Sequence, residues 1–321
     1  MPEIFNREQI EGALQRIDVT AAIEEGFIAY SEGKVVVPPV GELVFHDPPG
    51  DVHIKYGYIK NGDYFVIKVA SGFYDNVKLG LPSADGLMLV FSQKTAQLEC
   101  ILLDECHLTN VRTAAAGAVV AKYLAPKKVE RIGVFGAGVQ GKMQVEALLP
   151  IVDCREVVVW GTSEEELEAY RWAMSRHGLT IQTTLTSDEI AATCNLIVTA
   201  TPSHIPLLRA DQIREGTHIT AMGSDTREKN ELDPAILGKA DLVVADSIEQ
   251  CRVRGEIYHA LTAGVLREGD ALELGEVIVD EALQRTADSQ ITVADLTGVA
   301  VQDIQISKAV YQVLESGRPS G

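Results

Sequence analysis

The chain has 321 residues, of which 46% are hydrophobic and 23% are charged, and its formal net charge is -18. This length is sufficient for two domains with a large core, and the composition is ordinary for a globular protein. The acidic balance argues against nucleic-acid and membrane partners, because sequence-independent binding to nucleic acids and to anionic membranes depends on basic surface.

The cysteines and histidines form no pattern that is typical of a disulfide framework or a metal site. Five cysteines are scattered without a CxxC pair, and seven histidines form no HxxxH motif. The start of the chain, MPEIFNREQI, lacks the basic and apolar regions of a signal peptide, and no apolar run approaches the roughly 18 residues of a membrane span. We therefore expect a cytoplasmic protein without a metal ion.

The first elements in chain order are a helix and several short strands. Residues 5–31 carry apolar positions at roughly helical spacing, and Asn6 with Gln9 resembles a capping box. The segment VVVPPVGELVFHDPPGD, residues 35–51, is rich in Pro and Gly and predicts short strands and turns.

A β-hairpin is predicted for residues 53–72, HIKYGYIKNGDYFVIKVASG. The pair Asn61-Gly62 favours a two-residue type I′ turn, because both residues accept positive φ. Counting outward from this turn places Lys55 directly opposite Lys68, and the alternation of side chains puts His53 on the same face.

The two opposed lysines require an anion if this face of the hairpin is buried. Like charges directly opposite one another destabilise a sheet, and a lysine is seldom buried without a partner. The anion is either a protein carboxylate or a ligand. Two alternatives remain open: the face is exposed to solvent, or a loop of three or four residues shifts the register.

Two further strands and an alanine-rich helix follow the hairpin. LMLVFS (87–92) and LECILLD (98–104) predict an antiparallel pair, and residues 109–124 predict a helix with Arg112 in its first turn. A guanidinium near a helix start is a preferred bidentate clamp for a carboxylate, although Arg112 is equally compatible with a surface position.

From Arg131 onward, apolar strands alternate with helices. The expected strands include RIGVFG, EVVVWG, CNLIVTATP, THITAMG and ADLVVAD, and the last segment has a strand-like start and an amphipathic helical end. This βαβ alternation predicts an α/β fold with a doubly wound parallel sheet.

The sequence Gly136-Ala137-Gly138-Val139-Gln140-Gly141 matches the dinucleotide-binding pattern GxGxxG. It follows an apolar strand and opens a helix, which is the context that the pattern requires. The first glycine allows a tight turn, the second lets the backbone approach a pyrophosphate, and the third packs helix on strand. A plain glycine-rich turn is the alternative.

The end of the second strand, Val159-Trp160-Gly161-Thr162-Ser163-Glu164, should distinguish NAD from NADP. It offers neither an acid at the strand tip for the ribose hydroxyls nor an arginine for a 2′-phosphate. Three consecutive glutamates, residues 164–166, would repel that phosphate, so the pattern favours NADH and leaves NADPH possible.

Asp225 follows the strand THITAMG, where the loop faces the ligand crevice of a parallel sheet. A carboxyl group there can hold or protonate a substrate nitrogen. The alternative is that Asp225 caps a helix, a role for which Asp is also well suited.

Together these segments resemble the ornithine cyclodeaminase/μ-crystallin family over nearly the whole chain. The matching segments are VIKVASGFYDN, LTNVRTAAAGAVVAKYLA, RIGVFGAGVQGKMQ, ITAMGSDTREKNELD and LTGVAVQDIQISKAV. The resemblance implies a Rossmann domain (113–294) inserted into an α+β domain (1–112 plus 295–321) that binds substrate and forms a homodimer. It also implies hydride exchange at a carbon that bears nitrogen.

The resemblance also implies roles for individual residues. Lys68 and Arg112 would bind the substrate carboxylate, and Lys68 and Asp225 would be the catalytic residues, with Asp225 as acid or base at the nitrogen. The predicted cofactor contacts are Thr113, Gly136, Gly138, Val139, Gln140, Gly141, Gly161, Thr162, Ser163, Thr201 and Met222.

The chain departs from the family pattern at two places. Cyclodeaminase-like members carry an arginine where this chain has residues 38–41, PPVG, and often a Met-Pro pair where it has residues 53–56, HIKY. One cation is lost and another, Lys55, appears opposite Lys68, which is unfavourable for a cationic substrate. The segment HIKYGYI resembles the iminosuccinate reductase branch, in which Lys55, with His53, would hold a second negative group of the substrate.

The function expected from the resemblance is the NADH-dependent reduction of a small anionic imino acid, with iminosuccinate giving L-aspartate as the preferred hypothesis. The alternatives are a cyclodeaminase of the ornithine or lysine type with bound NAD, an alanine dehydrogenase or cyclic ketimine reductase, and a non-catalytic dinucleotide-binding protein of the crystallin type.

Overall fold

The computed structural model describes residues 2–317, and the chain divides into two compact units. The first unit contains residues up to Thr113 together with the residues from Val299 onward, and the second contains Ala114–Gly298. The chain thus leaves the first unit within helix α3 (His107–Leu124) and returns to it just before helix α11 (Ala300–Ser316).

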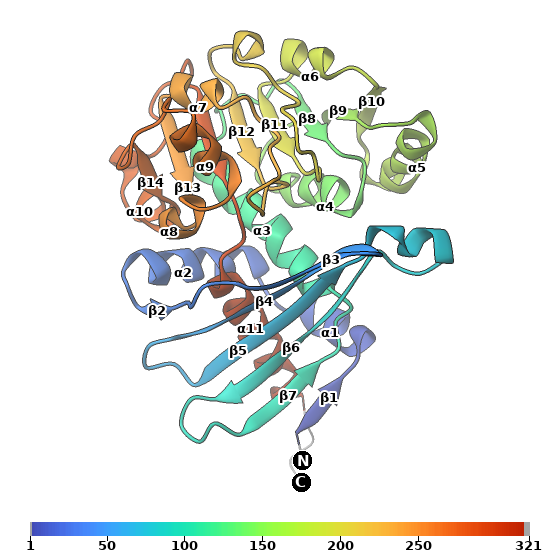
Figure 1. Ribbon diagram of the computed structural model, residues 1–321, viewed down its shortest axis with the longest axis vertical. Helices are drawn as coiled ribbons and strands as arrows, with labels where there is room; N and C mark the ends of the chain where they lie inside the picture. The colour runs from blue at the N-terminus through green and yellow to red at the C-terminus, as the bar shows by residue number, and fades with distance from the viewer. Residues whose placement is uncertain (1, 318–321) are drawn as a thin grey trace. The chain divides into compact units, whose positions relative to one another are not determined.

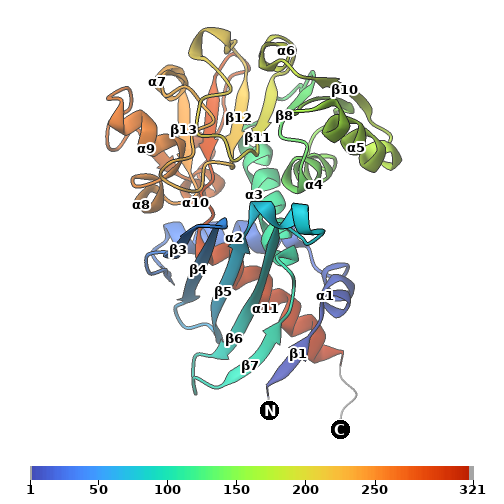
Figure 2. The ribbon, with the colours of Figure 1, turned by 45° about the vertical axis from the view of Figure 1, so that its right-hand side comes forward.

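The first unit is built on a seven-stranded mixed sheet with the order β1-β7-β6-β5-β4-β2, in which β3 also pairs with β4. Only the pairing of β1 with β7 is parallel. Figure 2 shows α11 lying across one face of this sheet, where it packs against β4 and β5. Besides α11 and part of α3, the elements are β1 (Glu3–Phe5), α1 (Arg7–Leu14), α2 (Val19–Ser31), β2 (Val35–Val36), β3 (Gly41–His46), β4 (Pro49–Ile59), β5 (Tyr64–Gly72), the 3-10 helix η1 (Tyr74–Leu79), β6 (Ala84–Ser92) and β7 (Leu98–Leu102).

The predicted hairpin is confirmed in its register but not in its turn. Strands β4 and β5 pair antiparallel, and Lys55 lies opposite Lys68 as expected. Of the two turn residues, only Asn61 has a positive φ, of 62°, so the turn is not of type I′. The side-chain amide of Gln93 donates to the carbonyl oxygens of Ile59 and Tyr64, which holds the strand ends together.

Two helix predictions need correction. The single helix expected for residues 5–31 is two helices, because Asp18 caps α2 by accepting a hydrogen bond from the N–H of Ala21. The capping box of Asn6 and Gln9 at the start of α1 is present. Helix α3 begins at His107, two residues earlier than expected, so Arg112 lies in its second turn.

The second unit contains the predicted doubly wound sheet, and the predicted fold class is confirmed. Its eight strands are all parallel and have the order β10-β9-β8-β11-β12-β15-β13-β14 (Figure 1). The elements are β8 (Ile132–Phe135), α4 (Val139–Leu148), β9 (Glu156–Trp160), α5 (Glu164–Met174), η2 (Ser175–His177), β10 (Thr180–Thr184), α6 (Ser187–Thr193), β11 (Leu196–Thr199), η3 (Ala210–Gln212), β12 (His218–Ala221), α7 (Ala235–Lys239), β13 (Leu242–Ala245), α8 (Ile248–Cys251), α9 (Gly255–Thr262), β14 (Ala271–Glu273), α10 (Leu274–Val279), η4 (Glu281–Leu283) and β15 (Thr292–Asp295).

The central strands of this sheet are buried on both faces. All four residues of β8, β11, β12 and β15 are buried, as expected for parallel strands covered by helices. The strand order reverses between β8 and β11, and this switch point is where such sheets bind ligands, beyond the carboxyl ends of the strands. The fold therefore places a ligand crevice at the turns that follow these two strands.

The described residues also limit the kinds of site that the chain offers. Among residues 2–317, no helix is both long enough and apolar enough to span a membrane. Within the same residues, no group of three or more His, Cys, Asp or Glu side chains is arranged to hold a metal ion. All five cysteines are free and buried.

Candidate active site

The glycine-rich turn between β8 and α4 has the geometry of a phosphate-binding turn. Gly136 has a φ of 109°, and a Cβ on it would lie 2.8 Å from the carbonyl oxygen of Ala200. A Cβ on Gly141 would lie 1.9 Å from the carbonyl oxygen of Gly136, whereas a Cβ on Gly138 would meet no atom within 4 Å. The turn is thus closed on the helix side and open at Gly138, where N–H groups at the start of α4 can approach a pyrophosphate.

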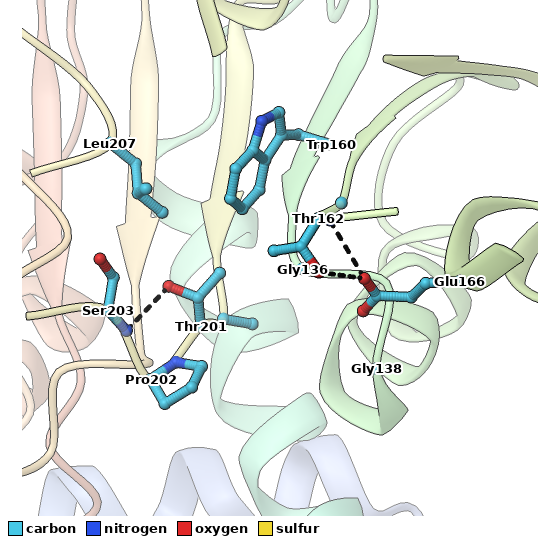
Figure 3. A pocket seen from close by; sticks show the side chains of 11 residues that line it. Gly136, Gly138, Trp160, Thr162, Glu166, Thr201, Pro202, Ser203 and Leu207 are labelled. Atoms are coloured by element: carbon cyan, nitrogen blue, oxygen red, sulfur yellow. Dashed lines mark hydrogen bonds between the residues drawn. The ribbon is translucent and has the colours of Figure 1, made fainter. Parts of the chain in front are cut away.

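A cavity of about 420 Å³ lies beside this turn (Figure 3), within the usual size range of small-molecule sites. Its walls come from the loops that follow β8, β9 and β11. The lining residues are Gly136, Gly138, Trp160, Gly161, Thr162, Glu166, Ala200, Thr201, Pro202, Ser203 and Leu207. Five of the predicted cofactor residues are among them. The cavity and the open glycine turn together fit a dinucleotide.

A smaller hollow of about 170 Å³ shares Ala200, Thr201 and Pro202 with this cavity. It brings together the predicted residues Gln140, Met222 and Asp225, which come from α4 and from the loop after β12, and adds Lys229. Thr201 belongs to both linings.

Four other predicted cofactor residues do not line either space, and one of them is Gly141, which packs against the backbone of Gly136. Val139 begins α4 with its side chain 55% exposed, and Ser163 caps α5 by accepting a hydrogen bond from the N–H of Glu166. Thr113 lies on α3, where its hydroxyl donates to the carbonyl oxygen of Thr109.

A buried carboxylate that the sequence did not single out holds the walls of both spaces. Glu231 is fully buried, and its carboxylate accepts hydrogen bonds from the hydroxyl of Thr199, from the N–H and hydroxyl of Thr201, and from the N–H of Gly223. Burial raises the pKa of Glu231 even though these donors oppose the shift. Glu231 therefore fixes the loops after β11 and β12 relative to each other.

A second buried acid supports the first. The carboxylate of Glu256 accepts hydrogen bonds from the backbone N–H groups of Glu231 and Leu232 and from the side chain of Asn230. Burial, with the nearby charge of Glu231, raises the pKa of Glu256 to about 8.

The predicted catalytic residue Asp225 has a cationic partner four residues further along the chain. The amine of Lys229 lies 2.7 Å from Oδ1 of Asp225, and the Asp225 side chain is 34% exposed. A carboxylate in this position can accept a hydrogen bond from a protonated nitrogen. The spacing of four residues was visible in the sequence, but the pair was not predicted.

Lys55, Lys68 and Arg112 come together in the first unit around a carboxylate that the sequence analysis missed. Oδ1 of Asp303, on α11, lies 3.3 Å from the Lys68 amine and 3.1 Å from Nε of Arg112. Nη1 of Arg112 also donates to the side chain of Gln302, at 2.6 Å. Because Lys68 contacts α11, both lysines lie on the sheet face that this helix covers.

The electrostatics of this group follow from its burial. Lys55, Lys68, Arg112 and Asp303 are 6%, 2%, 5% and 1% exposed. Burial alone would raise the pKa of Asp303, but Lys68, Arg112 and Lys55 together hold it below its usual value. Burial lowers the pKa of the Lys68 amine, and Arg112 adds to that effect while Asp303 opposes it. The site thus combines three cations with one carboxylate that stays ionised.

His53 has protein partners of its own. Its Nε2 lies 2.9 Å from the carboxylate of Glu42 on β3, and its Nδ1 lies 3.8 Å from Asp51. The ring is thus flanked by two acidic side chains, whose charge disfavours a further anion beside it.

Comparison with known proteins gives the class to which this fold and site belong. The sequence profile of the ornithine cyclodeaminase/mu-crystallin family matches residues 2–318. An uncharacterized cyclodeaminase of Sinorhizobium fredii is 40% identical over 95% of both chains. The chain belongs to the ornithine cyclodeaminase/mu-crystallin family, a family of NAD-dependent oxidoreductases that act on amino and imino acids.

Two solved structures extend the comparison. An archaeal alanine dehydrogenase dimer with bound NAD is 33% identical, with a TM-score of 0.89 over 98% of this chain and 96% of its own. The iminosuccinate reductase of Paracoccus denitrificans, in complex with NAD⁺, is 30% identical, with a TM-score of 0.87 over 98% of this chain and 97% of its own. The predicted family and the predicted class of enzyme are confirmed.

Proposed function

We propose that the chain is an NADH-dependent reductase that converts iminosuccinate into L-aspartate. The observation that carries this proposal is the buried pair of Lys55 and Lys68 beside Arg112 and Asp303. Three of these four groups are cations, so the group favours a ligand that brings more than one carboxylate. The similarity to the Paracoccus denitrificans enzyme supports the same substrate.

In this proposal the first unit binds the imino acid and the second unit binds the dinucleotide. The reduced nicotinamide supplies the hydride when it is bound. Arg112 and Lys68 bind the α-carboxylate, and Lys55 binds the second carboxylate. Asp303 holds Lys68 and Arg112 in place through contacts of 3.3 and 3.1 Å. This arrangement fixes the carbon that accepts hydride.

The imine nitrogen needs a proton partner, and we assign that role to Asp225. Its carboxylate would hold the protonated nitrogen directly or through a water molecule. Lys229, at 2.7 Å, orients this carboxylate. His53 is left outside the substrate contacts in this proposal, because Glu42 and Asp51 flank its ring.

The experiment compares cofactor oxidation by wild type and Lys55→Ala, with NADH and ammonia plus oxaloacetate, pyruvate or a cyclic ketimine. Loss of a charge-assisted contact should raise KM for the dicarboxylic substrate about 30- to 150-fold and leave pyruvate turnover unchanged. Lys60→Ala is the matched control, because Lys60 lies on the same hairpin and its amine donates to the carbonyl oxygen of Gly33.

Reductive amination of pyruvate is the second candidate, favoured by the similarity to the archaeal alanine dehydrogenase. Turnover of pyruvate that exceeds turnover of oxaloacetate, and that is indifferent to Lys55→Ala, would establish it and would refute the role of the paired lysines.

We further propose that the chain acts as a homodimer through the first unit, as its alanine dehydrogenase relative is a dimer. Strand β3 offers apolar surface for this purpose, because Leu43, Val44 and Phe45 are 54%, 62% and 41% exposed. A monomeric mass in sedimentation at micromolar concentration would contradict the dimer.

A further inference from the structure

The nucleotide cavity of the second unit has one ionisable side chain among the described residues that line it, Glu166 (Figure 3). Glu166 is the third residue of α5, after Glu164 and Glu165. Those two side chains are exposed and do not belong to the lining. The three glutamates are indistinguishable in the sequence, whereas in the structure only one of them faces the cavity.

Hydrogen bonds hold the Glu166 carboxylate at the tip of the second strand. Its Oε2 accepts from both the N–H and the hydroxyl of Thr162, each at 3.1 Å. Its own N–H donates to the hydroxyl of Ser163. The carboxylate is therefore fixed toward the turn between β9 and α5 rather than free to move in solvent.

The glycine at the strand tip makes room for this arrangement. A Cβ on Gly161 would lie 3.2 Å from Oε2 of Glu166 and 2.9 Å from the side chain of Leu167. Any side chain at position 161 would therefore press against the carboxylate. The end of β9 carries no acidic residue, and Glu166 of the following helix α5 places a carboxylate there instead.

We propose that Glu166 is the residue that makes the site select NADH over NADPH. The end of the second strand is where a Rossmann fold meets the adenosine ribose, and a carboxylate there accepts hydrogen bonds from ribose hydroxyls. A 2′-phosphate would instead meet a like charge in a partly enclosed cavity. This inference rests on the proposed use of a nicotinamide dinucleotide.

The surroundings offer nothing to compensate a 2′-phosphate. No lysine or arginine is among the described residues that line the cavity. Two donors of the turn, the N–H and hydroxyl of Thr162, already donate to Glu166. Arg171, on the same helix, is bonded to Glu168 and Thr183. Three acids at the start of α5 also cancel the attraction of its N-terminus for anions.

The test measures the Kd of NADH and of NADPH by calorimetry for wild type, Glu166→Gln and Glu165→Gln. Wild type should bind NADH at least tenfold more tightly, and Glu166→Gln should reduce the ratio of the two Kd values by about tenfold or more. Glutamine keeps an oxygen that can accept from Thr162, so the turn should remain folded. Glu165→Gln removes the same charge outside the cavity and should change the ratio by less than about twofold.

An unchanged ratio in Glu166→Gln, or an equal change in Glu165→Gln, would overturn the assignment of Glu166. A wild type that prefers NADPH would overturn it as well. If Glu166→Gln does not fold, Glu166→Ser gives the same comparison. These outcomes leave imine reduction by wild type intact, whereas a wild type that binds neither dinucleotide refutes the proposed function together with this inference.

Discussion

Replacing Asp303 by asparagine removes the only carboxylate that contacts both Lys68 and Arg112 among the described residues. All three side chains are at least 94% buried. Asparagine has nearly the same shape, so the change isolates the charge. The variant leaves Lys55, Lys68 and Arg112 close together without the anion whose pKa these three side chains hold below its usual value.

Removal of one partner from a buried ion pair costs about 3–5 kcal/mol, because the remaining charge stays in a poorly solvated position. The pKa of Asp303 is lower in the folded chain than in the unfolded chain, so its contribution is complete above the ordinary carboxyl pKa and is lost as pH falls through the folded pKa. The difference between wild type and variant should therefore be full at neutral pH and shrink below about pH 4.

The assay is urea-induced unfolding followed by far-ultraviolet circular dichroism at several pH values. Asp211→Asn is the control, because Asp211 forms an exposed ion pair with Arg209, and its loss should cost less than about 1 kcal/mol. A free energy of unfolding for Asp303→Asn within about 0.5 kcal/mol of wild type at neutral pH would refute the reasoning.

Two further predictions concern the second unit. Gly141→Ala should destabilise the folded chain even without a ligand, because its Cβ would lie 1.9 Å from the carbonyl oxygen of Gly136. Gly138→Ala should fold normally, because its Cβ would meet no atom within 4 Å, and should lose NADH affinity. Thermal unfolding measures the stability of each variant, and calorimetry measures its NADH affinity. Equal melting temperatures for wild type and Gly141→Ala would contradict the predicted loss of stability. Burial, with nearby Arg285, lowers the pKa of His218 to about 3. As pH falls, the unfolded chain therefore binds a proton on His218 before the folded chain does. The free energy of unfolding should decrease by up to about 1.4 kcal/mol per pH unit as pH falls from 6.5 to 3. His218→Gln should remove this slope in urea unfolding, and an unchanged slope would argue against it.

The hairpin shows how far a local pattern can predict structure. Lys55 and Lys68 were expected opposite each other from a turn signal and a period of two, and they are. The turn type was wrong because it depends on the φ of Gly62 as well as on that of Asn61, and residue identity permits both values at glycine. The register is the predicted one although β4 ends at Ile59 and β5 begins at Tyr64, because this longer connection is still centred on Asn61 and Gly62.

Elements without a strong apolar pattern were the ones missed. Strand β10 (Thr180–Thr184) lies at the edge of its sheet and alternates between exposed and partly buried residues, so TIQTT lacks an apolar run. The break between α1 and α2 was missed because apolar residues continue on both sides of it, and Asp18 alone marks the new start.

The candidate site was predictable only where one chain segment carries the chemistry. The glycine turn is such a segment, and the structure gives its glycines the expected surroundings. Asp303 pairs with Arg112 across 191 positions, and an acid within an amphipathic helix ordinarily faces solvent. The role of Glu231 is also invisible in the local sequence, because its donors are Thr199 and Thr201, about 30 positions earlier in the chain, and Gly223.

The position of β15 has a consequence for how the protein is made. This strand pairs with β12 on one side and β13 on the other, although it follows both by many residues in the chain. The first unit is likewise incomplete without α11, which supplies Asp303 and packs on its sheet. A growing chain therefore leaves the ribosome with a gap in the parallel sheet and an uncovered mixed sheet until its C-terminal end emerges. Nascent chains arrested before Thr292 should be cut by protease in both units, and protection of either unit would show that it folds earlier than the topology implies.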